Sequence, residues 1–156
     1  MTELLIGILT LGGLVAFQMA MRHRSQRSMA EAWEQAQAEL ARGNHEAGAA
    51  HLEACIRIMP LWLPPRFLLG TLFAKLGRLA EAEDQFKMAQ ALQPREAEGL
   101  LELGIFYLTA ANRVEEGVAA LREAIACDGA AAQRIQSDPR LRAFRDSSDY
   151  ALLEQP

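Results

Sequence analysis

Residues 63–96 read LPPRFLLGTLFAKLGRLAEAEDQFKMAQALQPRE, and this stretch holds the clearest copy of a pattern that recurs along the chain. Gly70 in this copy has counterparts at Ala36 and Gly104, each 34 residues away. A period of this length is typical of a solenoid, in which one helical hairpin cannot bury its apolar face alone and stacks on copies of itself. The sequence therefore predicts an all-α fold built from repeated hairpins.

Further series of positions keep the same spacing of 34 or 35 residues. They are Gly43, Gly77 and Asn112; Gly48, Ala82 and Gly117; Leu52, Phe86 and Leu121; Cys55, Ala89 and Ala124; and Pro60, Pro94 and Gly129. The third copy is one residue longer than the others, and the extra residue falls just before Asn112. Asparagine tolerates the left-handed backbone conformation better than most residues, so we expect the turn at this point to survive.

The central copy resembles the tetratricopeptide repeat (TPR), whose pattern runs W-x2-L-G-x2-Y, then A-x3-F, then P. The residues that carry the resemblance are Leu69, Gly70, Phe73, Ala82, Phe86 and Pro94. One departure is Arg66, which stands where the family favours an aromatic residue. The resemblance implies a TPR domain over residues 29–131, an α-solenoid of three helical hairpins at about 29–62, 63–96 and 97–131.

An uncharged stretch precedes the repeats. Leu4–Met21 covers 18 residues without a charged side chain, and at about 1.5 Å per helical residue it would span roughly 27 Å, close to the thickness of the bilayer core. Arginines follow this stretch and none precedes it, which favours an uncleaved anchor over a cleaved signal peptide. Two alternatives stay open, namely cleavage at Ala20, which would place the domain in the periplasm, and burial of this helix in a soluble domain.

The sequence thus predicts a single transmembrane helix over residues 1–22 and a basic juxtamembrane linker over 23–28. The positive-inside rule keeps the arginine-rich side in the cytoplasm, so the N-terminus should lie outside and the repeats inside. In layout the chain resembles membrane-anchored bacterial TPR proteins, which implies a location in the inner membrane and the lipid bilayer as one partner.

Small residues form a strip along the predicted membrane helix. Gly12, Ala16 and Ala20 recur every four residues, which would let another transmembrane helix pack closely against this side. Gly and Ala are common in such segments in any case. We nevertheless name the strip as a candidate contact with other transmembrane helices.

The last residues, 132–156, do not continue the repeat. Asp138 followed by Pro139 is typical of a helix start, and Leu141 and Phe144 would share one face of the next helical turns. We predict a C-terminal capping segment that covers the apolar edge of the third hairpin. The alternative is a self-inhibitory segment that lies in a binding groove.

The resemblance also implies a binding site, because the first helices of successive TPR hairpins line a concave groove. The matching positions are Trp33, Gln37 and Leu40 in the first unit, Phe67, Thr71 and Ala74 in the second, and Leu101, Ile105 and Leu108 in the third. Most of these side chains are large and apolar, which on an exposed surface indicates an interaction site. We predict that the groove binds an apolar or amphipathic segment of a protein partner. The alternative is that this stripe packs internally, against the C-terminal tail or the linker.

Several classes of function are disfavoured. Lys75 is the only basic residue near the predicted groove, which argues against the clamp of Lys, Asn and Arg by which some TPR domains hold acidic tails. The formal net charge of −4 argues against nucleic-acid binding. The chain lacks the common phosphate-binding, dinucleotide-binding, metalloprotease and hydrolase motifs. We therefore expect no catalytic residues, no metal and no cofactor.

Taken together, these patterns predict a non-enzymatic, membrane-anchored TPR adaptor or scaffold that recruits or assembles partner proteins through its groove. The alternative function is that of a constitutive small accessory subunit of a larger membrane protein complex.

Overall fold

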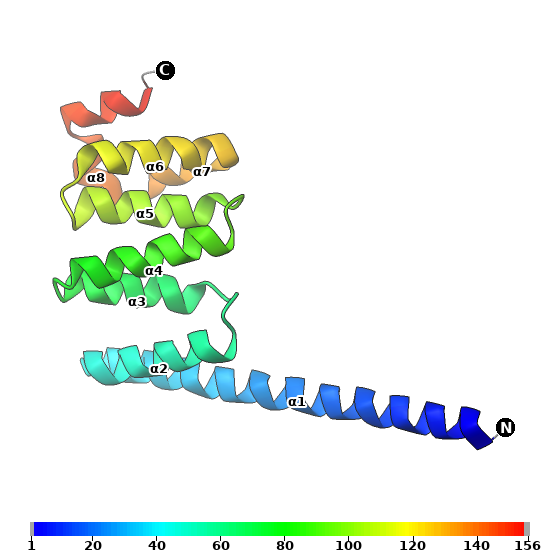
Figure 1. Ribbon diagram of the computed structural model, residues 1–156. Helices are drawn as coiled ribbons and strands as arrows, with labels where there is room; N and C mark the ends of the chain where they lie inside the picture. Colours follow the sequence, from blue (N-terminus) through cyan, green and yellow to red (C-terminus); the bar gives the residue numbers. More distant parts are fainter. Residues whose placement is uncertain (1, 155–156) are drawn as a thin grey trace. The chain divides into compact units, whose positions relative to one another are not determined.

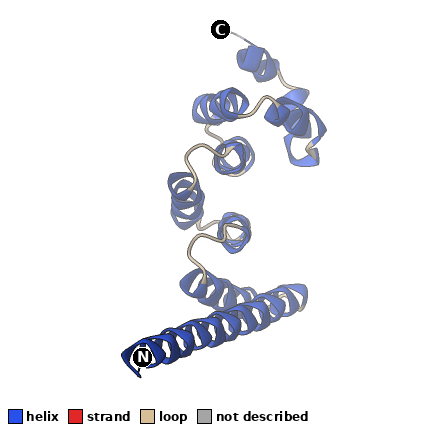
Figure 2. Ribbon diagram, turned by 90° about the vertical axis from the view of Figure 1, so that its right-hand side faces the viewer, coloured by secondary structure: helices blue, strands red, loops and turns tan. Residues whose placement is uncertain are grey.

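The computed structural model describes the backbone of residues 2–154 and the side chains of residues 14–153, and all regular structure in that part is helical (Figures 1 and 2). The chain divides into two compact units, Met1–Pro60 and Leu61–Pro156, and each is described by itself. The prediction of an all-helical fold is confirmed for these residues.

The first unit is one helical hairpin, made of α1 (Thr2–Ala41) and α2 (His45–Ile58). Ala36 and Leu52 are fully buried where the two helices meet. Gly43 makes the turn between them with a φ of 81°, a left-handed conformation that costs glycine little. Residues 23–28, which the sequence analysis treats as a linker, are helical and continue α1 without a break.

The predicted membrane anchor is wrong. Within the described residues, no helix offers a stretch long and apolar enough to cross a bilayer.

The predictions that depended on the anchor are corrected with it. They are the single transmembrane helix in the fold, the inner-membrane location with its topology, and the lipid bilayer as a partner. Ala16 and Ala20, two members of the predicted packing strip, are exposed on α1. Gly12, the third member, lies outside the residues whose side chains are described.

The second unit contains two further hairpins. The first pairs α3 (Pro64–Lys75) with α4 (Leu79–Leu92), and the second pairs α5 (Ala97–Thr109) with α6 (Val114–Cys127) (Figure 1). A Cβ atom at Gly70 would lie 2.9 Å from the ring of Phe86, so the glycine leaves room for this ring between α3 and α4. The turns of the two hairpins contain Gly77 and Asn112, with φ of 75° and 53°. The prediction that asparagine replaces glycine in the left-handed turn is confirmed.

The two hairpins of this unit pack on each other along α4 and α5. The rings of Phe86 and Phe106 lie 5.3 Å apart between their centroids. The Tyr107 hydroxyl donates to Glu83 Oε1 at 2.8 Å, and Arg113 Nη1 donates to Glu83 Oε2, also at 2.8 Å. Burial and the hydrogen bond to this carboxylate raise the pKa of Tyr107. An apolar contact and a charged network therefore hold the successive hairpins together.

The tail folds onto the second hairpin of this unit as α7 (Ala130–Ser137), the 3-10 helix η1 (Pro139–Leu141), α8 (Arg142–Arg145) and the 3-10 helix η2 (Ser148–Glu154). The Asp138 side chain caps η1 by accepting a bond of 2.8 Å from the backbone N–H of Arg140, as the sequence predicts. Ile135 and Leu141 are completely buried in one apolar cluster with residues of α5 and α6. The tail is thus part of the core of the second unit.

Candidate functional site

A small pocket opens on the side of the second unit where α3 faces α5, and we call this surface the α3–α5 face. The pocket has a volume of about 60 Å³ and is lined by Thr71, Ala74, Phe86, Glu102, Ile105, Phe106, Thr109, Ala110 and Arg140. These residues come from both hairpins of the unit and from the tail. The pocket therefore depends on how the hairpins stack.

The two threonines of the pocket satisfy their hydroxyl groups within their own helices. Thr71 Oγ1 donates to the carbonyl oxygen of Phe67 at 2.8 Å, and Thr109 Oγ1 donates to that of Ile105 at 2.7 Å. Such bonds to the preceding turn are common for threonine in helices and fix the side-chain rotamer. Each threonine thus uses its only side-chain hydrogen-bond donor within its own helix.

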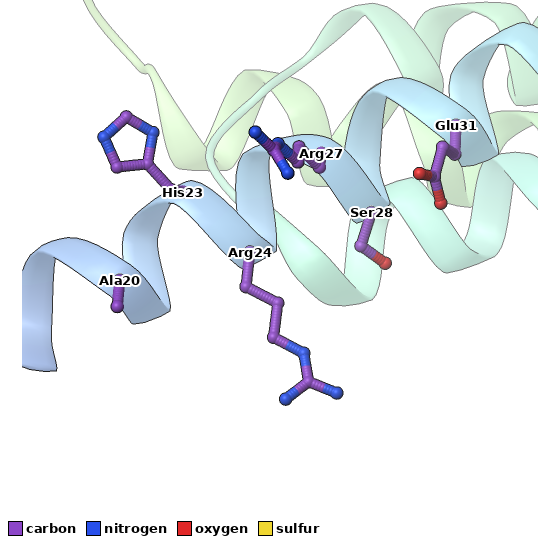
Figure 3. A pocket seen from close by; sticks show the side chains of 6 residues that line it. All are labelled: Ala20, His23, Arg24, Arg27, Ser28 and Glu31. Carbon is purple, nitrogen blue, oxygen red and sulfur yellow. The ribbon is translucent and has the colours of Figure 1, made fainter.

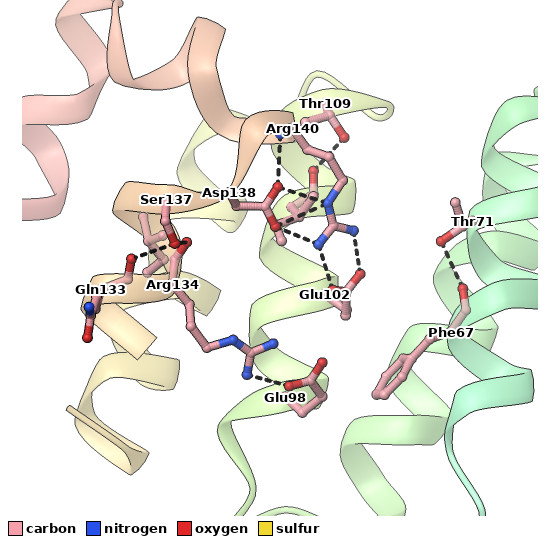
Figure 4. Close-up of polar contacts among 12 residues, drawn as sticks. Phe67, Thr71, Glu98, Glu102, Thr109, Gln133, Arg134, Ser137, Asp138 and Arg140 are labelled. Carbon is pink, nitrogen blue, oxygen red and sulfur yellow. Dashed lines mark hydrogen bonds and ion pairs between the residues drawn. The ribbon is translucent and has the colours of Figure 1, made fainter. Parts of the chain in front are cut away.

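The polar side of the pocket is a fixed cluster of Glu102, Asp138 and Arg140 (Figure 4). Arg140 Nη1 and Nη2 donate to Glu102 Oε2 and Oε1, each at 2.8 Å, which is the bidentate geometry that arginine and carboxylate prefer. Arg140 Nη2 also donates to Asp138 Oδ2 at 2.7 Å. The Glu102 and Asp138 carboxylates raise the pKa of Arg140, and the Arg140 side chain lowers that of Asp138.

A second ion pair continues this polar row along α5. Arg134 of α7 donates to Glu98 Oε2 of α5 (Figure 4). Glu98 raises the pKa of Arg134 through this hydrogen bond. Glu98 and Glu102 stand one helical turn apart, so each pairs with a different tail arginine. Two arginines of the tail, Arg134 and Arg140, are thus matched by carboxylates of α5.

Comparison with known proteins identifies the fold. No model of a protein family matches the sequence, and no curated protein matches it. The first TPR domain of Spaghetti (RPAP3), solved with the HSP90 peptide SRMEEVD, superposes with a TM-score of 0.61 at 12% identity, over 83% of this chain and 95% of that one. This chain has the fold of a TPR domain.

Two other structures superpose on the chain. The Yersinia enterocolitica type III secretion chaperone SycD, solved with a peptide of the translocator YopD, gives a TM-score of 0.58 at 13% identity, over 82% of this chain and 91% of SycD. The O-GlcNAc transferase of Thermobaculum terrenum gives 0.55 at 25% identity, over 68% of this chain. The match covers only 20% of the transferase.

The predicted groove residues of the second unit divide into two groups. Phe67, Thr71 and Ala74 are half-buried along α3, and Thr71 and Ala74 line the pocket. Leu101 and Ile105 of α5 are only 1% and 3% exposed, because they belong to the apolar cluster that the tail covers. On α5 the stripe thus packs largely internally, although Ile105 still forms part of the pocket wall.

Leu108 completes the predicted groove residues of α5. It packs across its hairpin against α6, where a Cβ atom at Gly117 would lie 2.5 Å from its Cγ. Leu40 does the same in the first unit, against Gly48 of α2. Both leucines are half-buried. They therefore help to hold their hairpins together.

The remaining predicted groove residues, Trp33 and Gln37, lie on α1 of the first unit, half-buried and exposed respectively. Elsewhere on α1 a hollow is lined by Ala20, His23, Arg24, Arg27, Ser28 and Glu31 (Figure 3). All six residues belong to one helix and are exposed. This hollow is thus a polar, mostly basic surface of a single helix.

Sequence reasoning missed the charged side of the pocket. Glu102 is the one charged residue in the stretch from Gly99 to Thr109, and this isolated carboxylate is a signal that could have been used. A charge at a position that faces the core needs a partner, and Arg140 lies far away in the sequence. Among the described residues, no cluster of three or more His, Cys, Asp and Glu side chains could hold a metal ion.

Proposed function

We propose that this chain is a non-enzymatic TPR adaptor that binds a segment of a partner protein on the α3–α5 face. The observation that carries the proposal is the pocket itself, which is lined by residues of two successive hairpins and of the tail. Two of the structures with the same fold contain a bound peptide, one from HSP90 and one from YopD. A peptide-binding role is therefore compatible with this architecture.

The chemistry of the face favours a segment with apolar side chains. Phe67 and Ala74 are half-exposed on α3, and most of the pocket wall is apolar. An acidic tail is disfavoured because Glu98, Glu102 and Asp138 already hold Arg134 and Arg140. The HSP90 peptide SRMEEVD, which carries three acidic side chains, should therefore bind this chain at least tenfold more weakly than a neutral apolar peptide of equal length.

Site-specific photocrosslinking tests the location of the site. A photoreactive amino acid is placed at Thr71 or Ala74 in the full chain and, as the control, at Lys87, which is exposed on α4. We expect crosslinks to a protein partner from Thr71 and Ala74 and none to the same partner from Lys87. Equal crosslinking from the three positions, or crosslinking from Lys87 alone, would show that the partner uses another surface.

A further inference from the structure

We propose that the pocket takes a small aliphatic side chain, Ala or Val, from a partner segment of extended backbone, and that Arg140 donates to a backbone carbonyl of that segment. This inference rests on the proposed function and specifies the ligand of the same site. It excludes two other kinds of ligand, namely a helical segment and a segment that presents a carboxylate to Arg140.

The volume of the pocket sets the size of the side chain. One water needs a cavity of roughly 10–15 Å³, and a cavity of about 150 Å³ accommodates benzene. The value of about 60 Å³ lies between these limits. It therefore suits one to three aliphatic carbons, whereas an aromatic side chain is too large. The methyl and aromatic carbons of Ala74, Ile105 and Phe106 provide apolar contacts for such a group.

The hydrogen bonds of Arg140 determine which polar group can lie beside the pocket. A guanidinium has five N–H donors, and Arg140 uses one on Nε, one on Nη1 and two on Nη2 for Glu102 and Asp138. One N–H on Nη1 is left for a partner, and the side chain is 43% exposed. Arg140 can therefore donate one further bond from a position that is already fixed.

An uncharged acceptor fits this donor better than a carboxylate. A carboxylate on Nη1 would be the third on one cation, close to Glu102 and Asp138, and like charges at such distances repel. A backbone carbonyl brings no charge. Carbonyls in the interior of a helix already accept bonds within the helix, and only those of its last turn are free. An extended segment can offer a free carbonyl along its length, which favours it here.

The packing of the tail holds Arg140 in its position beside the pocket. Ile135 and Leu141 are completely buried, and exposing aliphatic side chains of this size to water is unfavourable. Arg145 Nη1 also donates to the carbonyl oxygens of Ile135 and Asp138, at 2.9 and 2.7 Å. Displacing the tail would break these contacts together. These contacts hold Arg140 beside the pocket.

The experiment selects binders from a displayed library of random decapeptides on the immobilised full chain. The best peptide is then synthesised with Ala, Val, Phe or Asp at the position selected for small residues, and each version is titrated by fluorescence anisotropy. We expect Ala or Val to bind at least tenfold more tightly than Phe or Asp, and the bound peptide to show no helical circular dichroism.

Substitutions connect this preference to the pocket. Ala74→Leu, near the end of α3, and Ala110→Leu, just after α5, each place a larger side chain in the pocket. Either should reduce the preference for Ala or Val over Phe or Asp from tenfold to less than threefold. Ala91→Leu is the matched control, because Ala91 is exposed on α4 and does not line this pocket. It should leave the preference unchanged. Far-UV circular dichroism of each variant verifies that it is folded.

The outcomes separate this inference from the proposed function. If filling the pocket weakens binding but the peptides prefer Phe or Asp, or bind as helices, the inference is wrong and the proposed function stands. If neither pocket variant changes the binding of any selected peptide, both are wrong. A library that yields no binder also overturns both.

Discussion

The pair of Glu102 and Arg140 offers the most quantitative test of the second unit. Arg140→Gln leaves the Glu102 carboxylate, whose side chain is 11% exposed, without its cation. Hydrogen bonds to charged groups are worth roughly 1.5–3 kcal/mol, and breaking a fully buried pair costs roughly 3–5 kcal/mol. Arg140 is 43% exposed, so solvent screening reduces the value. We expect a loss of about 2 kcal/mol in the free energy of unfolding.

A double-mutant cycle isolates the contribution of the pair itself. Arg140→Gln, Glu102→Gln and the double variant are unfolded in urea and followed by circular dichroism at 222 nm. The two residues share two bonds of 2.8 Å, so the coupling energy should be about 1.5–2 kcal/mol. A loss of 2 kcal/mol corresponds to a decrease in Tm of about 4–8 °C for a chain of this size.

The control in this experiment is an exposed ion pair. The side chains of Arg142 and Asp146 are 84% and 74% exposed, and their closest charged atoms are 4.0 Å apart. The double-mutant cycle of Arg142 and Asp146 should give a coupling energy near zero. If Glu102 and Arg140 also couple by less than about 0.5 kcal/mol, the cluster does not hold Arg140 in place and the reasoning about its fixed donor is refuted.

Other changes test the packing, each by urea unfolding. Arg66→Met should stabilise the chain by up to about 1 kcal/mol, because the Nε of Arg66 is buried without a hydrogen-bond partner. Asn112→Ala should cost about 1 kcal/mol more than Asn112→Gly, since alanine fits a φ of 53° poorly; equal values would contradict the left-handed turn. Gly99→Ala should cost about 1–2 kcal/mol, because its Cβ would lie 2.8 Å from a backbone Cα of α4; no loss would mean that the helices separate freely. Arg140 lowers the pKa of Asp138 below its ordinary 3.8. The ionised carboxylate therefore contributes its full stabilisation above pH 3.8, and this contribution is lost as the pH falls through the lowered pKa. In Asp138→Asn, the free energy of unfolding should therefore fall less below about pH 4 than it does in the unsubstituted chain. If both show the same pH dependence, the contact between Asp138 and Arg140 would be contradicted.

The features that the sequence predicted well depend on local chemistry or on fixed spacing. Gly77 and Asn112 take the left-handed conformation because a tight turn between helices requires it. Gly70 and Phe86 complement each other because a close approach of two helices needs one small and one large residue. Such requirements recur in every hairpin, so they are visible as a period.

The features that it predicted poorly depend on what covers an apolar residue. Leu101 and Ile105 belong to an apolar stripe, and their burial comes from a tail about 35 residues further along the chain. Apolar composition shows that a residue favours burial and does not show which surface provides it. The assignment of the uncharged stretch Leu4–Met21 to a membrane rested on composition in the same way.

The way in which the tail covers α5 and α6 has a consequence for protein engineering. A further hairpin would have to occupy the apolar surface that Ile135 and Leu141 now fill, so it could not simply be appended after residue 154. In a longer array, the new hairpin would have to be inserted between Cys127 and Ala130. Residues 130–153 would then follow the new hairpin as one unit, or cassette, and cover its apolar surface. The same cassette could terminate designed arrays of other lengths, provided that the first helix of the last hairpin carries acidic residues matched to Arg134 and Arg140, as Glu98 and Glu102 of α5 are here.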